Sequence, residues 1–322
     1  MNRYKIHHVT EFTYDGTVSE SFNEVRLRPL DDDRQSCLRF RLLTRPLAPV
    51  AARTDYYGNW VHQFNVLAGH RHLRVDAESV VMVQPVELPA AGGVSLTQLD
   101  AMKDDLEDEF YEYLAPTRYV PHLEAARKLV QDAEREPAGS TLAFAQTASS
   151  LVHTRFRYEK GATHVHSSME DSLSSGAGVC QDFAHLLLAV VRMRGLPGRY
   201  VSGYLMPRKA SEGGNSMEEV IGGQASHAWM EVHVPELGWV PLDPTFGRPV
   251  GIQHVRIAYG RDYGDVTPVR GVYKGHAGQH LSVDVLVLPA LNEEGHELLV
   301  ETAAGPVEPP PESVPQQQQQ QQ

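Results

Sequence analysis

The 322-residue chain lacks most of the features that assign a sequence to a specialised class of protein. It has only two cysteines, too few for a disulfide framework, and its first residues lack the apolar stretch of a secretory signal, so we expect the reducing cytoplasm. No apolar run approaches the ~20 residues of a membrane-spanning helix. The net charge of −12 comes without a basic stripe. We therefore expect neither membrane residence nor binding to nucleic acid.

The first quarter of the chain alternates between apolar and polar side chains, as half-buried strands do. In one run, Leu38, Phe40 and Leu42 point one way and the arginines between them point the other. Turn-forming residues separate the runs at spacings suited to an antiparallel sandwich or meander. We expect a β-rich domain over residues 1–84, with no catalytic group of its own. Residues 85–93, rich in proline, alanine and glycine, predict a linker.

Helical segments and then strand-like segments follow this linker. Helices are expected over residues 100–113, 122–136 and 141–152, and a fourth helix from Cys180. Strands are expected over residues 199–205, 226–234 and 239–242, with more over residues 255–259, 281–288 and 298–300. Helices before antiparallel strands indicate an α+β fold and not a wound parallel sheet. The core would span residues 85–302 with its C-terminal strands, and the proline- and glutamine-rich residues 303–322 would be a disordered tail.

Cys180 stands at the start of the fourth helix, after the small residues 176–178. Apolar side chains then recur at three- and four-residue spacing until Gly195 ends the run. Free N–H groups and the positive end of the helix dipole favour a thiolate at this position, which makes Cys180 a candidate nucleophile. Asp182 in the same turn could act beside it, although such a residue more often caps the helix. Cys37 lies in a strand-like run and is expected to be a bystander.

His227 and Asp243 could serve this cysteine as base and orienting acid. The strand-like runs that contain them are joined by three loop residues and form a predicted hairpin. If Val234 opposes Gly238, Asp243 lies one diagonal step from His227 on the same face. Asp243 would then accept the N–H of one imidazole nitrogen and leave the other nitrogen to take the proton of Cys180.

Each of these residues also has an ordinary structural explanation, and the sequence contains two other histidine patterns. A cysteine at a helix start is often only packed, a strand histidine is often only buried, and Asp-Pro-Thr is a common turn. The 16 histidines include His164-x-His166 and Asp182-x-x-His185, but none has HExxH order or a zinc-site spacing, so we expect no metal. The glycine-rich residues 211–223 could form a flap beside the site, although a surface insertion is more common.

The ordered set of motifs resembles the transglutaminase-like superfamily of cysteine enzymes. The segments that carry this resemblance are Gly178-Val179-Cys180-Gln181-Asp182-Phe183-Ala184, Arg199-Tyr200-Val201-Ser202-Gly203-Tyr204, His227-Ala228-Trp229-Met230-Glu231, Gly238-Trp239 and Asp243-Pro244-Thr245. Marks similar to those of bacterial members with a β-rich N-terminal region are Tyr4, Ile6, His8, Leu27, Pro29, Gly58, Asn59 and Leu73, and Gly260-Arg261-Asp262-Tyr263 with Asp265-Val266 resembles their C-terminal signature. The resemblance implies a papain-like core after an all-β N-terminal domain, with Cys180 as nucleophile, His227 as base and Asp243 as orienting acid.

The resemblance implies a class of chemistry but not one reaction. In this superfamily a cysteine thioester is resolved by amines in transglutaminases and by water in peptidases and amidases, and some members are inactive. The resemblance implies peptide or amide substrates, with proteins of peptide or amide bond formation as partners. No calcium-binding loop is present and no cofactor is expected. A catalytically inactive binding or scaffold protein is the alternative, and the oligomeric state is open.

The proposed thioester chemistry needs donors for the oxyanion. The backbone N–H of Cys180 is one by position, and Gln181 and Tyr158 are candidates for a second. Trp229 is expected to shield the ion pair and to fill the core more than to bind substrate.

Overall fold

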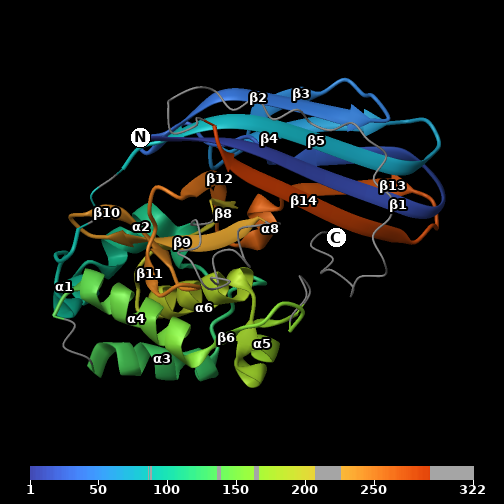
Figure 1. The fold of residues 1–322 in the computed structure, drawn as a ribbon. Helices are drawn as coiled ribbons and strands as arrows, with labels where there is room; N and C mark the ends of the chain where they lie inside the picture. Colours follow the sequence, from blue (N-terminus) through green and yellow to red (C-terminus); the bar gives the residue numbers. More distant parts are fainter. Residues whose placement is uncertain (86, 88, 136–138, 163–166, 207–225, 291–322) are drawn as a thin grey trace, which may run out of the picture.

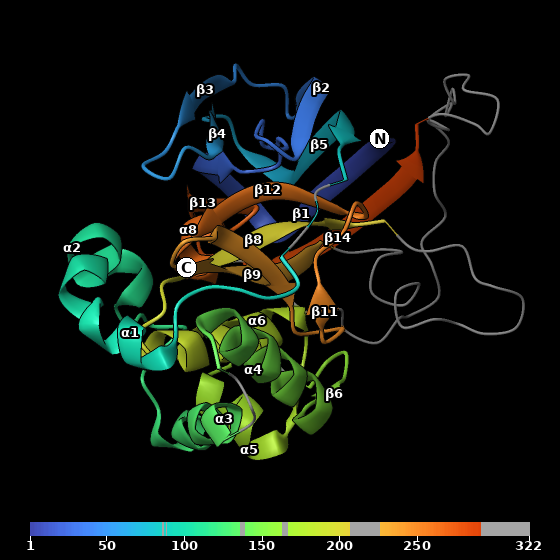
Figure 2. The same cartoon turned by 90° about the vertical axis from the view of Figure 1, so that its left-hand side faces the viewer.

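The computed structural model describes residues 1–85, 87, 89–135, 139–162, 167–206 and 226–290, and it arranges them in three layers (Figures 1 and 2). The N-terminal strands form one side of the molecule, a five-stranded sheet lies in the middle, and the helices cover the opposite face of that sheet. This is the expected α+β core preceded by an all-β N-terminal region. Residues 303–322, the strand expected over 298–300 and the loop over 211–223 lie outside the described residues.

The N-terminal layer is built around the long strand β1. Its strands are β1 (Asn2–Val25), β2 (Gln35–Arg45), β3 (Ala51–Thr54), β4 (Trp60–Val66) and β5 (His70–Val83), in the order β2-β5-β1-β4-β3. The first half of β1 pairs with β5, and after a register shift between Thr13 and Val18 its second half pairs with β4. One strand thus serves two sheets that enclose a separate apolar core, which includes Phe12, Phe64 and Val75.

Two strands near the other end of the chain complete this N-terminal layer. Strands β13 (Val269–Lys274) and β14 (Gln279–Pro289) both pair antiparallel with β1 (Figure 1). This pairing departs from the expectation that the C-terminal strands belong to the core. Alternation shows which face of a strand is buried but not which strand it pairs with, so the sequence pattern could not reveal the partner.

Helix α6 lies at the centre of the helical layer. The helices are α1 (Leu96–Ala101), α2 (Lys103–Leu114), α3 (Glu124–Arg135), α4 (Thr141–Arg155), α5 (Met169–Ser175) and α6 (Cys180–Met193), with the short α8 (Tyr263–Val266) after the sheet. From Phe183 to Arg192 every side chain of α6 is buried, because α3, α4 and the sheet pack around it. A helix that is apolar on nearly all sides is stable only in such a position.

The middle sheet has the order β11-β10-β9-β8-β12 and is antiparallel throughout. Its strands are β8 (Gly198–Leu205), β9 (His227–Val234), β10 (Gly238–Asp243), β11 (Arg248–Pro249) and β12 (His254–Gly260). Val234 pairs with Gly238, so the predicted register of the hairpin is confirmed. Two short strands, β6 (Arg157–Tyr158) and β7 (Ala177–Gly178), pair in parallel beside the start of α6.

Buried polar contacts join the N-terminal layer to this sheet. The Asn59 side chain donates from Nδ2 to the carbonyl of Tyr259 at 2.8 Å and accepts the N–H of the same residue at 2.9 Å. Nδ1 of His8 hydrogen-bonds to the Tyr204 hydroxyl at 2.7 Å.

None of the helices in the described part of the chain is long and apolar enough to cross a membrane.

Candidate active site

Cys180 is the first residue of α6, and the segment before it is shaped by two short elements. Gly176 ends α5 in the left-handed conformation, with φ of 62°, and β7 then leads into the helix. The Cys180 side chain is buried, at 6% exposure. Because Cys180 and Gln181 begin the helix, their backbone N–H groups have no acceptor within it. The thiol therefore lies beside free backbone donors at the positive end of a long buried helix.

Asp182 makes the contacts of a helix cap. Its Oδ2 accepts the backbone N–H of Val179 at 2.8 Å, and its Oδ1 accepts the hydroxyl of Ser172 at 3.0 Å. A Cβ on Gly178 would lie only 2.7 Å from Asp182 Oδ2, so the glycine is needed for the carboxylate to fold back over the turn. These contacts fit the more common of the two roles expected for Asp182, which is to fix the start of the helix that carries Cys180.

His227 and Asp243 meet in the interior of the molecule. His227 is the first residue of β9 and Asp243 the last of β10, and His227 Nε2 lies 2.7 Å from Asp243 Oδ2. The Thr245 backbone N–H donates to the other carboxylate oxygen at 3.0 Å. Both side chains are almost completely buried. The hairpin therefore brings together the imidazole and the carboxylate that its predicted register placed one step apart.

The charges of this pair support each other. Burial alone would raise the pKa of Asp243, but the imidazolium of His227 and the hydrogen bonds from two histidines hold it well below its usual range. Burial alone would lower the pKa of His227, but Asp243 and, after it, Cys180 raise it to about 10. The pair therefore favours an ionised carboxylate beside a protonated imidazole at neutral pH.

The second nitrogen of the imidazole, Nδ1, does not face Asp243. It is buried and has no hydrogen-bond partner among the described residues. After Asp243, the Cys180 side chain is one of the groups that raise the pKa of His227. The thiol, the imidazole and the carboxylate are all buried, and the protonation of His227 depends on both of the others.

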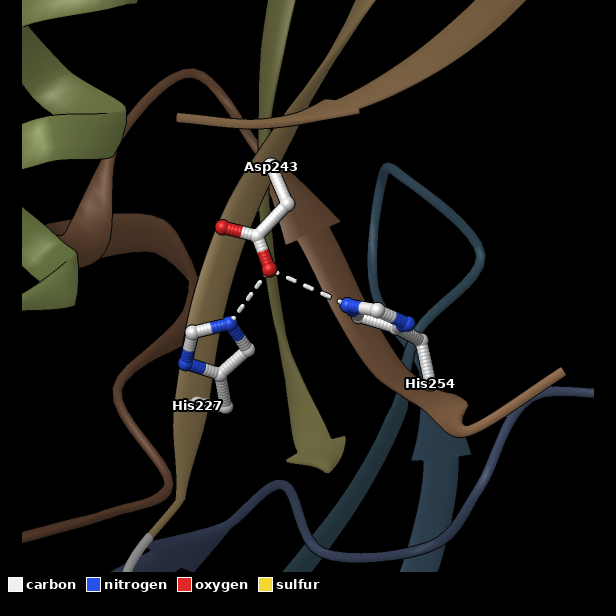
Figure 3. A group of neighbouring side chains, drawn as sticks. All are labelled: His227, Asp243 and His254. Atoms are coloured by element: carbon white, nitrogen blue, oxygen red, sulfur yellow. Dashed lines mark hydrogen bonds and ion pairs between the residues drawn. The ribbon is translucent and has the colours of Figure 1, made fainter. Parts of the chain in front are cut away.

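His254 is a fourth member of the site that sequence reasoning missed. It begins β12, and its Nε2 lies 3.0 Å from the same Asp243 Oδ2 that His227 contacts (Figure 3). The Gly251 backbone N–H donates to His254 Nδ1 at 3.2 Å. Nδ1 is therefore an acceptor, and Nε2 is protonated and donates a hydrogen bond to Asp243. None of the sequence motifs places a histidine eleven positions after Asp243. The contact between these two residues could therefore not be predicted from the sequence.

Comparison of the sequence with known proteins identifies its family. The sequence model of the bacterial transglutaminase-like N-terminal region matches residues 4–82, and that of the transglutaminase-like superfamily matches residues 127–244. An uncharacterised protein of Mycobacterium leprae is 37% identical over 288 residues, which cover 88% of this chain and 98% of that protein. The chain belongs to the transglutaminase-like superfamily.

Two further similarities extend this assignment. A solved protein from Cytophaga hutchinsonii, described as a candidate cysteine protease, superposes with a TM-score of 0.65 at 22% identity, over 89% of this chain and 91% of that one, and so shares its fold. A protein-glutamine gamma-glutamyltransferase of Pseudomonas aeruginosa is 29% identical over 126 residues, which cover 38% of this chain and 18% of that enzyme.

Three buried side chains of this transglutaminase-like site are of residue types that bind metal ions. One ligand atom each from His227, Asp243 and His254 lie within 4.8 Å of one another. Two ligands of a tetrahedral zinc ion stand about 3.4 Å apart, since each lies about 2.1 Å from the metal. The observed separations of 2.7 and 3.0 Å are shorter and fit hydrogen bonds. In the pattern Asp182-x-x-His185, Nε2 of His185 accepts the N–H of Tyr263. The two histidines of the other pattern, His164 and His166, lie outside the described residues.

The remaining predicted residues lie around Cys180 and His227. Tyr158 lies on β6, paired with Gly178 on β7, and burial, then Cys180, raises the pKa of its hydroxyl. Gln181 is buried in the first turn of α6. Trp229 is fully buried, with ring centroids 5.9 Å from His227 and 5.1 Å from His254. The indole therefore packs beside both imidazoles, and its role as a shield of the ion pair stays a prediction.

Proposed function

We propose that this transglutaminase-like protein is a cysteine enzyme that acts on amide bonds of peptide-like substrates through a thioester on Cys180. The observation that supports this most directly is the buried His227, whose Nε2 hydrogen-bonds to Asp243 at 2.7 Å, whose Nδ1 has no partner among the described residues, and whose pKa is raised by Asp243 and then by Cys180. An imidazole bound to a carboxylate on one side and close to a thiol on the other can take and return a proton.

The proposed reaction has two halves. In the first, the Cys180 thiolate forms a C–S bond to the amide carbonyl, and the C–N bond breaks as Nδ1 of His227 gives its proton to the leaving amine. In the second, water or an amine attacks the thioester, His227 takes its proton, and the thiolate leaves. The backbone N–H of Cys180 would donate to the oxyanion, with Gln181 or Tyr158 as the proposed second donor.

Substrate chemistry and acyl acceptor are part of the proposal. The partial similarity to the Pseudomonas enzyme favours a glutamine side chain as one amide to test as acyl donor. Water as acceptor would make the protein a peptidase or amidase, and an amine would make it a transferase. Adding a primary amine to a reaction that releases ammonia or a peptide separates the two, because only transfer leaves the amine covalently bound to the product.

Selective alkylation tests whether the thiol is a nucleophile. The chain supplies its own control in Cys37, a free, half-buried cysteine whose thiol pKa is raised by burial. We expect iodoacetamide at pH 6, where an ordinary thiol reacts slowly, to label Cys180 faster than Cys37, and His227→Ala to abolish that difference. Equal rates for the two cysteines, or no effect of His227→Ala, would instead favour a catalytically inactive scaffold.

A further inference from the structure

Asp243 shares one oxygen between two buried histidines, and only one of them faces Cys180. His227 and His254 approach Oδ2 from different strands (Figure 3). The Thr245 N–H donates to Oδ1. His254 is neutral in this arrangement, because burial lowers its pKa and its Nδ1 accepts the Gly251 N–H. It therefore acts as a fixed, uncharged donor to the carboxylate.

The His254 side chain is not closely packed on all sides. Its ring borders a cavity of about 110 Å³ at the boundary between the N-terminal layer and the core. The charged residues that line this cavity are Arg34 of the N-terminal layer, Glu231 of β9 and Arg256 of β12, and Arg256 also pairs with Asp32 and Asp33. Glu231 and Arg256 pair with each other at 3.1 Å, so neither replaces His254 as a partner of Asp243. A side chain similar in size to histidine could therefore be accommodated at position 254.

We propose that His254 is a positioning residue: by donating Nε2–H to Asp243 it fixes the carboxylate at the angle that keeps His227 directed at Cys180. This inference rests on the proposed function, since it gives His254 a part in the same proton transfer. Without His254 the carboxylate keeps one donor on each oxygen, His227 on Oδ2 and the Thr245 N–H on Oδ1. The second donor on Oδ2 approaches from another strand, so the carboxylate cannot turn about its Cβ–Cγ bond without lengthening one of the two histidine hydrogen bonds.

Two substitutions separate the donor from the bulk of the ring. His254→Gln keeps an N–H donor at nearly the reach of Nε2, and His254→Leu keeps volume without a donor. We expect His254→Leu to slow labelling of Cys180 at pH 6 about tenfold, the lower end of what loss of an orienting partner costs in comparable sites. His254→Gln should recover most of that loss. With a turned-over substrate, kcat should fall in the leucine variant while KM stays unchanged.

Matched controls exclude a general loss of structure. His8, a buried histidine that bonds to Tyr204 and Thr10 and not to Asp243, is changed to Gln and to Leu in parallel. Melting temperatures are recorded for all variants. We expect the two His8 variants to label alike, and the difference between His254→Gln and His254→Leu to disappear in an Asp243→Asn background, because the two residues act as one unit.

The outcomes separate this inference from the proposed function. If Cys180 of the wild-type protein labels no faster than Cys37, the proposed function fails and the role of His254 fails with it. If wild-type labelling is fast but the two His254 variants match each other, or both match the wild type, only the positioning role is overturned. Fast labelling, slowed by leucine and restored by glutamine at equal melting temperature, supports the proposal.

Discussion

At the scale of single residues, Asp243 keeps a negative charge in a fully buried position because three donors converge on it. His227 and His254 donate to one of its oxygens and the backbone of Thr245 to the other. A buried carboxylate without such partners takes up a proton. The charge of Asp243 is therefore maintained by its neighbours, and it in turn keeps His227 protonated.

This coupling predicts how stability depends on pH. The raised pKa of His227 means that its protonation stabilises the fold fully below about pH 6.5, and that this contribution is lost as the pH rises toward about 10. The lowered pKa of Asp243 means that its contribution is present above about pH 4 and is lost only in stronger acid. The melting temperature of the wild type should therefore exceed that of Asp243→Asn most between pH 5 and 6.5. A difference that stays constant up to pH 10 would contradict the ion pair.

The sequence allowed the contact between His227 and Asp243 to be predicted because it is local. Both residues lie in one hairpin, whose register follows from its short loop and the opposition of Val234 and Gly238. The contact from His254 depends on β12 reaching the sheet through β8, and such pairing leaves no mark in residue spacing. The catalytic roles of these residues, unlike their positions, stay proposals.

At the scale of elements, the start of α6 depends on a turn with little spare room. The Asp182 carboxylate folds back onto Val179, and Gly178 leaves the space that it occupies. This fixes the direction in which the helix presents Cys180.

The long helices were predictable because each has an apolar stripe or an apolar composition over three turns or more. The seven-residue α5 and the six-residue β13 were not expected, since such short elements show too few periods of a pattern.

Gly178→Ala tests this turn. The added methyl group would lie 2.7 Å from Asp182 Oδ2 and displace the cap, so we expect the free energy of unfolding to fall by about 1–3 kcal/mol. Labelling of Cys180 by iodoacetamide should slow as well. Gly139→Ala is the matched control, because none of the described residues has an atom within 4 Å of a Cβ at that position. Denaturant unfolding of both variants checks the prediction, and equal stability losses would be evidence against a specific role for the turn.

At the scale of the whole molecule, the N-terminal layer is completed by two strands that come after the core in the sequence. Strand β14 pairs with β1 from Tyr4 to Tyr14, and β13 pairs with the far half of the same strand. Sequence patterns predicted the all-β N-terminal region and the α+β core, because both follow from local periodicity. They could not predict that the two parts share strands, since the pairing joins residues more than 240 positions apart.

This shared layer predicts that the core does not fold by itself. A chain of residues 85–290 would leave β13 and β14 without the strand they pair with, and would expose the backbone groups of Tyr259 that Asn59 satisfies. We expect this fragment to be insoluble or to unfold without a cooperative transition. Producing it together with residues 1–84 should restore cooperative unfolding and labelling of Cys180. A soluble, cooperatively folded fragment 85–290 would show that the core is independent.

The most direct measurement for the account as a whole is the intact mass of the protein after brief reaction with a pool of glutamine-containing and amide-capped peptides. Acid quenching should preserve a thioester, and fragmentation should locate it. We predict a mass increase equal to a peptide minus its leaving amine, located on Cys180, released by hydroxylamine and absent from Cys180→Ala. Wild-type protein that reacts quickly with iodoacetamide and yet gains no acyl group from any peptide would contradict the proposed chemistry on amides. An adduct that persists in Cys180→Ala would contradict the role of Cys180.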